Sequence, residues 1–174
     1  ISGTRFLAED EFRTLPDPEL YYKGGGIQLK TVDPDFWNLD PQNKVDHAFQ
    51  IEKEVLGKDE RIISMTASYN DSYSGRVMVA SNGFEGDKEN TSYSVVASVS
   101  VKDGEVRPQG YWWESSLYYS QLLSDGVGTK ALKRTLERLG QKKIQSGAMP
   151  MIIENRSVGR MLRPLINALN GSSI

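Results

Sequence analysis

The chain has 174 residues, a length that fits one domain of ordinary size or one domain plus part of another. Its 21 basic and 23 acidic residues leave a net charge of −2, which excludes recruitment of nucleic acid or an anionic membrane by an overall basic field. It has no cysteine and one histidine, His47, so it can form neither a disulfide framework nor a thiolate metal site, and no apolar run approaches the length of a membrane span.

Residues 1–38 are predicted to be a linker. Pro16, Pro18 and Pro34, together with a run of three glycines at 24–26, block any long regular element.

Residues 41–57 are predicted to be a helix. Pro41 follows Asp40, which is expected to cap the first turn, and Gly57 is expected to end the helix. His47 lies between charged neighbours, so we expect a solvent-facing or edge residue rather than a metal ligand. The positions expected to form the buried stripe of this helix are Val45, Ala48, Phe49, Ile51, Glu52 and Val55.

Residues 61–114 are predicted to form a four-stranded antiparallel meander, because polar and apolar residues alternate along much of this stretch. Two segments, YNDSYSG at 69–75 and GFEGDKEN at 83–90, are rich in turn-forming residues and are predicted to be a turn and a loop. Asp103-Gly104 is the clearest hairpin signal, and it precedes the last strand.

An aromatic cluster ends this region at Tyr111, Trp112 and Trp113. Such rings form a stacking surface for a peptide, a partner protein or single-stranded nucleic acid, or else they pack beneath the next helix. Basic residues do not interleave with the rings in the sequence, and this favours packing over nucleic-acid binding. The cluster stays a candidate peptide or partner surface.

Residues 124–140 are predicted to be the second long helix, capped by Ser124 or Asp125 and closed by Gly140. One side is apolar, whereas the other is basic and interrupted by Glu137, which is typical of a solvated face.

The last segment is predicted to be a strand followed by an amphipathic helix. Met149–Ile153 is an apolar run long enough for a strand and too short for a helix. Asn155 or Ser157 is expected to cap the helix, and Pro164 predicts either a kink or a regular part that begins near Arg163. The apolar positions at helical spacing are Val158, Met161, Leu162, Leu165, Ile166 and Leu169.

No catalytic constellation can be built from these residues. A Ser–His triad could use His47 alone, and no nucleophile-elbow Gly-x-Ser-x-Gly or calcium-binding EF-hand spacing occurs. On its residues alone, the chain is an α+β domain in which an antiparallel meander packs with helices at about 41–57 and 124–140, followed by a strand-helix segment.

The C-terminal segment nevertheless resembles the TldD/PmbA family, through its strand, its Glu-Asn turn and the patterns G-R-x-L, L-x-x-A-L-x-G and S-x-I. In the TldD branch of that family, the helix carries His-Glu-x-x-x-His, whose histidines bind zinc and whose Glu is the general base. Arg163, Pro164 and Ala168 lie at these positions here. Arginine stays protonated, and proline and alanine carry no ligand atom, so the resemblance points to the PmbA branch, also called TldE, which lacks the motif.

The resemblance also implies a domain plan and a function. Residues 1–38 would link to a missing N-terminal domain, 39–145 would be the central α/β domain, and 146–174 would begin a truncated C-terminal domain, so the chain would be an internal piece of a longer protein. The family implies a cytoplasmic, non-catalytic subunit with no cofactor of its own. Its partner would be a TldD-like chain that carries zinc, and the pair would degrade unfolded peptides and process peptide precursors.

Two alternatives remain open. One is an active metallopeptidase whose site lies wholly in the missing C-terminal part. The other is a gyrase- or nucleic-acid-associated binding module, which the net charge of −2 disfavours.

Overall fold

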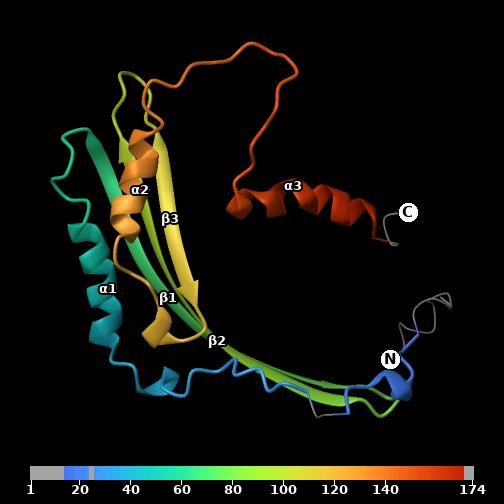
Figure 1. The fold of residues 1–174 in the computed structure, drawn as a ribbon. Helices are drawn as coiled ribbons and strands as arrows, with labels where there is room; N and C mark the ends of the chain where they lie inside the picture. Colours follow the sequence, from blue (N-terminus) through green and yellow to red (C-terminus); the bar gives the residue numbers. More distant parts are fainter. Residues whose placement is uncertain (1–13, 24–25, 171–174) are drawn as a thin grey trace, which may run out of the picture. The chain divides into compact units, whose positions relative to one another are not determined.

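The computed structural model describes residues 14–23 and 26–170, and the chain divides into two units, Ile1–Gly140 and Gln141–Ile174. In the first unit, a three-stranded antiparallel sheet is covered on one face by helices α1 (Pro41–Lys53) and α2 (Val127–Leu136) (Figure 1). The described part of the second unit holds helix α3 (Asn155–Ala168). Short 3-10 helices lie at η2 (Pro18–Leu20), η3 (Phe36–Asn38) and η4 (Tyr119–Gln121).

The sheet consists of β1 (Ile62–Val79), β2 (Glu85–Val101) and β3 (Gln109–Ser116), in the order β1-β2-β3. The α+β class and the antiparallel sheet are therefore confirmed, but the four-stranded meander was wrong. The segment 69–75 is not a turn, because it continues β1, and most of the predicted loop 83–90 belongs to β2.

The long β1–β2 hairpin explains this correction. The two strands pair without interruption from Ser64 opposite Ser100 to Val79 opposite Glu85, so every residue between them is held in the ladder. The chain reverses only near Gly83, which has a φ of +87° that glycine adopts without strain. Cooperative strand pairing outweighs the local turn preference of Asn, Asp and Ser, whose effect is weak when a partner strand continues alongside.

The core lies between the sheet and the two helices. Alternate residues of β2 are fully buried beneath the helices, and these are Thr91, Tyr93, Val95, Ala97, Val99 and Val101. Ile51 and Val55 from the α1 side, and Val127 and Ala131 from α2, complete the cluster. The intervening β2 residues, mostly serines, form the opposite face of the sheet.

Helix α1 begins as predicted, with the side chain of Asp40 accepting a hydrogen bond from the Gln42 backbone N–H at 2.9 Å. Helix α2 does not, because its N-cap is Gly126, with a φ of +77°, rather than Ser124 or Asp125. Both predicted caps are used elsewhere: Ser124 lies against His47, and Asp125 accepts a hydrogen bond from Gln50.

The segment before α1 packs along β2 at the point where β3 ends. Ser116, the last residue of β3, pairs with Tyr93, and beyond it the Thr91 backbone N–H donates to the Thr31 carbonyl at 3.0 Å. The Thr31 hydroxyl in turn donates to the Glu89 carbonyl at 2.6 Å. The described part of the predicted linker therefore satisfies main-chain groups on the β3 side of β2, although it forms no strand.

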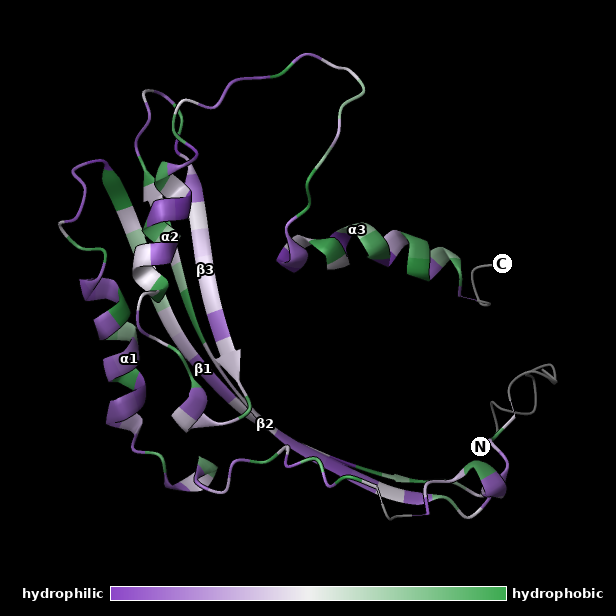
Figure 2. Ribbon diagram, in the orientation of Figure 1, coloured by the Kyte–Doolittle hydropathy of each residue, from purple (hydrophilic) through white to green (hydrophobic). Residues whose placement is uncertain are grey.

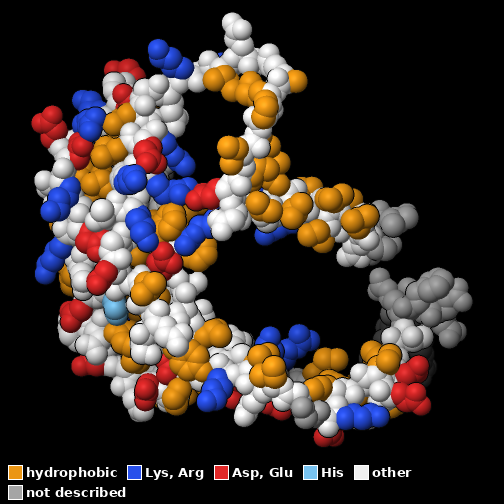
Figure 3. Space-filling model, in the orientation of Figure 1, with side chains coloured by type: hydrophobic (Ala, Val, Ile, Leu, Met, Phe, Trp, Pro, Cys, Tyr) orange, Lys and Arg blue, Asp and Glu red, His pale blue; other side chains and the backbone are white. Residues whose placement is uncertain are grey.

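In the second unit, the predicted strand Met149–Ile153 is wrong, because these residues are irregular and no described segment pairs with them. Helix α3 follows at once and runs through Pro164, so its regular part begins well before Arg163. Its N-cap is Glu154, with no side-chain capping bond, rather than Asn155 or Ser157. Hydrophobic residues recur along α3 and are exposed (Figures 2 and 3). Among all described residues, no helix has the length and apolar character needed to cross a bilayer.

The contact between α1 and α2 depends on Gly128, and this gives a stability prediction. A Cβ at position 128 would lie 2.5 Å from the Ile51 carbonyl oxygen and 2.9 Å from a Val55 methyl carbon, so the helices would have to separate. Gly128→Ala should lower the free energy of unfolding by about 1–3 kcal/mol. Urea denaturation followed by tryptophan fluorescence reports the first unit, because all three tryptophans lie there.

The matched control is Gly159→Ala on α3, where an added Cβ meets nothing within 4 Å. It should leave the fluorescence-detected transition unchanged. An unchanged urea midpoint in Gly128→Ala would show that the helices do not need this close approach.

Candidate functional site

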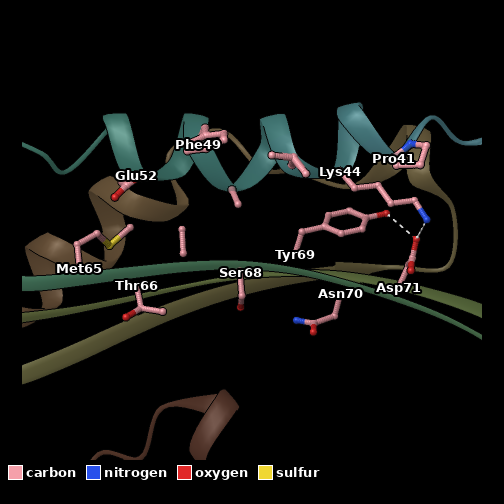
Figure 4. Close-up of a pocket in the computed structure, with 13 residues that line it drawn as sticks. Pro41, Lys44, Phe49, Glu52, Met65, Thr66, Ser68, Tyr69, Asn70 and Asp71 are labelled. Atoms are coloured by element: carbon pink, nitrogen blue, oxygen red, sulfur yellow. Dashed lines mark hydrogen bonds and ion pairs between the residues drawn. The ribbon is translucent and has the colours of Figure 1, made fainter.

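A groove of about 820 Å³ runs between α1 and β1 in the first unit (Figure 4). Its volume is within the usual range for ligand pockets, and it is open to solvent. The α1 side is formed by Pro41, Lys44, Val45, Ala48, Phe49 and Glu52. The opposite side is formed by seven consecutive residues of β1, from Met65 to Asp71.

Consecutive strand residues line the groove in two ways. Met65, Tyr69 and Asp71 point toward α1, whereas Thr66 and Ser68 point to the other face of the sheet (Figure 4). The residues that point away can contribute only their main chain. Because β1 is an edge strand of the described sheet, the groove is bounded on this side by backbone N–H and C=O groups.

One end of the groove is polar. The Lys44 ammonium lies 2.5 Å from a carboxylate oxygen of Asp71, and the Tyr69 hydroxyl donates to the same oxygen at 3.3 Å. Burial, and then the negative charge of Asp71, raise the pKa of Tyr69 well above its ordinary value. Tyr69 is therefore a hydrogen-bond donor at neutral pH and not a candidate base.

His47 lies behind Tyr69 in a hydrogen-bonded cluster. Its ring stacks on Tyr69, with centroids 5.7 Å apart and planes 10° apart. Its Nδ1 is 2.9 Å from the Ser124 hydroxyl, and its Nε2 is 2.9 Å from the Tyr119 hydroxyl. His47 is therefore half-buried rather than facing solvent, and with both ring nitrogens engaged it links α1 to the segment that precedes α2.

Asp33 supports the same cluster from the opposite side. Its carboxylate accepts from the backbone N–H of Tyr119 at 2.8 Å and from that of Asp35 at 3.0 Å. Burial alone would raise the pKa of Asp33, but these two backbone donors, together with the Tyr93 hydroxyl, outweigh it and hold the pKa below the ordinary value. This buried carboxylate therefore stays ionised and serves to position η4.

The predicted aromatic surface is divided by the pleat of β3. Trp112 faces the helices, with the Lys130 ammonium and the Arg134 guanidinium each 5.2 Å from its ring centroid. Tyr111 and Trp113 lie on the opposite face of the sheet, with 46% and 40% of their surface exposed. The structure therefore does not bring the three rings together, and Trp112 packs beneath α2.

The three positions that match the zinc motif all lie on α3. Arg163, Pro164 and Ala168 offer no thiolate, imidazole or carboxylate, so the residues present do not fit a zinc ion. Elsewhere in the described part of the chain, no three His, Cys, Asp or Glu side chains are placed to share a metal.

The groove was missed from the sequence because the apolar arc of α1 was interpreted as a single buried stripe. Ile51 and Val55 are fully buried, but Val45 and Phe49 are 46% and 55% exposed in the groove. At 100° per residue, the arc from Ile51 round to Phe49 covers roughly 160°, which is wider than one contact surface requires. That excess width was the signal for a second, uncovered surface.

Comparisons with known proteins agree on one family. Residues 34–139 match the family model described as the PmbA/TldA metallopeptidase central domain. The chain is 24% identical over 176 residues to a metalloprotease PmbA homolog of Buchnera aphidicola, and 25% identical over 175 residues to metalloprotease PmbA of Escherichia coli O157:H7. These alignments cover 100% and 98% of the chain, which spans 39% and 38% of the two relatives' lengths.

Two crystal structures share the fold. One is of a proposed modulator of DNA gyrase from Bacteroides thetaiotaomicron, with 48% identity and a TM-score of 0.92 over 99% of this chain and 40% of that one. The other is of a proposed modulator of a DNA gyrase from Thermotoga maritima, with a TM-score of 0.61 over 73% of this chain and 30% of that one. At 22% identity, the second likeness is one of fold alone.

The Asp33 carboxylate leads to a prediction about pH. Because its folded pKa is depressed, Asp33 contributes stability that is fully present above the unfolded-chain value of 3.8 and is lost as the pH falls through its folded pKa. Asp33→Asn should lower the free energy of unfolding by about 1–3 kcal/mol at pH 7. The asparagine amide is uncharged and has one acceptor oxygen, so it cannot accept from both N–H groups as the carboxylate does. The difference in the free energy of unfolding between this variant and the parent chain should shrink as the pH falls below 3.8.

Urea midpoints at neutral and acidic pH measure this difference. Asp35→Asn is the matched control, because Asp35 is exposed, and it should change stability by less than about 0.5 kcal/mol. Equal destabilisation of the two variants would contradict the role assigned to Asp33.

Proposed function

This chain belongs to the TldD/PmbA family of metallopeptidase-related proteins, and we propose that within it the protein acts as a non-catalytic, PmbA/TldE-like subunit. In this proposal it pairs with a TldD-like chain that carries the zinc. The pair degrades unfolded peptides and processes peptide precursors in the bacterial cytoplasm. This chain completes the substrate cleft and stabilises its catalytic partner.

The observation that carries the proposal is the chemistry of α3. A helix that binds zinc through His-Glu-x-x-x-His needs two neutral imidazoles and a carboxylate, and Arg163, Pro164 and Ala168 supply none of these. Arginine at the first position would also repel a cation, since its guanidinium keeps its charge at all working pH values. A chain with these residues needs a partner if its complex is to cleave peptides with zinc.

The surface of α3 supports a role in contacts with further polypeptide. Met161, Leu162, Leu165, Ile166 and Leu169 are all exposed along the helix. Exposed apolar residues in a contiguous row are typical of a surface that another segment or another chain covers. The central domain, in contrast, has a complete core of its own beneath α1 and α2.

The first prediction concerns metal content. The complete natural protein, purified alone without a chelator, should contain close to no zinc by elemental analysis. The reason is that Arg163, Pro164 and Ala168 carry no atom that can bind zinc. A TldD-like relative that retains His-Glu-x-x-x-His, purified in the same way, is the matched control and should contain about one zinc per chain. A content of about one zinc in this protein would place ligands outside residues 1–174 and favour the active-metallopeptidase alternative.

The second prediction concerns assembly. When the complete protein is mixed with its TldD-like partner at micromolar concentration, sedimentation should show one species heavier than either chain alone. Peptide cleavage should require the TldD-like chain and should be lost with a chelator. Two independently sedimenting chains would refute the pairing.

The remaining alternatives would be recognised by the same preparations. Chelator-sensitive peptide cleavage by this protein alone would identify an active peptidase. Binding to DNA with a steep salt dependence would identify the nucleic-acid module, since phosphate contacts release counterions.

A further inference from the structure

We propose that the groove between α1 and β1 binds an extended peptide segment, which adds to the sheet as a strand beside β1. The peptide would form main-chain hydrogen bonds with the edge of β1 and place alternate side chains beneath α1. That the groove binds a strand stands on its own geometry. That the bound peptide is a substrate of the complex rests on the proposed function.

The free edge of β1 supplies the first argument. β1 pairs with β2 on one side, and no described segment pairs with it on the other. In an antiparallel pair, about half of the backbone N–H and C=O groups of each strand point away from the partner. Along Met65–Asp71 these groups border the groove, where another strand can satisfy them.

The overhang of α1 supplies the second argument. Val45 and Phe49 lie on the groove side of the helix and are about half exposed, although Ile51 near the end of α1 and Val55 just beyond it are fully buried. The helix therefore extends an apolar surface past the edge of the sheet. A strand laid beside β1 would be covered by that surface, just as β2 is covered by both helices.

The length and ends of the groove define the ligand further. Seven strand residues at about 3.4 Å each span roughly 20 Å, which accommodates a peptide of similar length. Side chains that face α1 would meet Val45 and Phe49 and should be apolar. Glu52 lines the end of the groove opposite Lys44 and Asp71 (Figure 4), so a basic peptide residue is favoured there.

An extended peptide fits this site better than a helix or a compact domain. A helix satisfies its own backbone groups and would leave the β1 edge unpaired, whereas an added strand pairs with it and gains specificity from alternate side chains. The main chain makes the same bonds whatever the sequence, so only the peptide positions that face α1 and Glu52 are restricted. Such tolerance is suited to unfolded peptides of varied sequence.

The test uses the complete natural protein without its partner and a fluorescein-labelled peptide, Lys-Val-Thr-Val-Thr-Val-Lys. The matched control peptide has the same sequence with N-methyl groups on alternate amides, which removes donors from one edge and blocks strand addition there. Two such peptides, methylated in the two alternate registers, cover both pairing edges. Fluorescence anisotropy should show binding of the unmodified peptide, and at least one methylated register should bind at least about tenfold more weakly.

Hydrogen exchange locates the bound peptide. The backbone amides of residues 65–71 that point away from β2 should exchange more slowly when the unmodified peptide is bound, while those of β3 should not change. Phe49→Asp should weaken binding about ten- to hundredfold, because it removes apolar contact area and puts a charge beneath α1. Leu123→Asp is the matched control, since Leu123 is exposed and lies outside the groove, and it should bind as the parent does.

Several outcomes would overturn the proposal. These are no peptide binding, equal binding of all methylated peptides, or slowed exchange at β3 instead of β1. Slow exchange of the outward-pointing amides of residues 65–71 before any peptide is added would show that another segment or a second copy already covers the edge. The concentration dependence of that protection would separate these two cases. If Phe49→Asp fails to fold by circular dichroism, Val45→Asp provides the same test. None of these results alters the zinc or assembly measurements, so this proposal can fail while the proposed function holds.

Discussion

The burial of one face of β2 is the interaction on which the rest of the first unit depends. β2 is the central strand, and its helix-facing residues from Thr91 to Val101 are fully buried. Because side chains alternate along a strand, a shift of one residue would exchange this apolar row for the serines between its members. The register of β1 and β3 on either side, and the placement of both helices, follow from holding this row in the core.

Several polar groups of the first unit support this packing. His47, Tyr119 and Ser124 form a chain of hydrogen bonds between α1 and the segment that enters α2. Asp33 holds η4 through the Tyr119 N–H and the start of η3 through the Asp35 N–H. Each group is satisfied by neighbours, which is what a buried polar residue requires if it is not to destabilise the fold. In the part of the chain that the structure describes, no three His, Cys, Asp or Glu side chains are placed to share a metal.

Surface left over from folding is where binding is expected in such a domain. The three described strands are too narrow to cover the whole apolar arc of α1, so Val45 and Phe49 extend beyond them, above a strand edge with which no described segment pairs. The exposed apolar face of α1 therefore needs apolar side chains to cover it, and the edge of β1 needs main-chain hydrogen-bond partners. Both requirements are met by a single extended segment.

The sequence by itself determined the fold class, the positions of the three helices, the start of α1 at Asp40 and Pro41, and the family. Helical periodicity, capping residues and motif spacing are local properties, so they can be interpreted without knowing what packs against them. Only the tertiary structure decided whether a local turn, strand or surface pattern in the sequence produced the corresponding structure. YNDSYSG became part of β1 because β2 runs alongside it, Met149–Ile153 formed no strand because nothing described pairs with it, and Trp112 was separated from Tyr111 and Trp113 by the pleat. The groove belongs to the same category, since whether Val45 and Phe49 are buried depends on how many strands lie beneath α1, and pairing between distant segments settles that number.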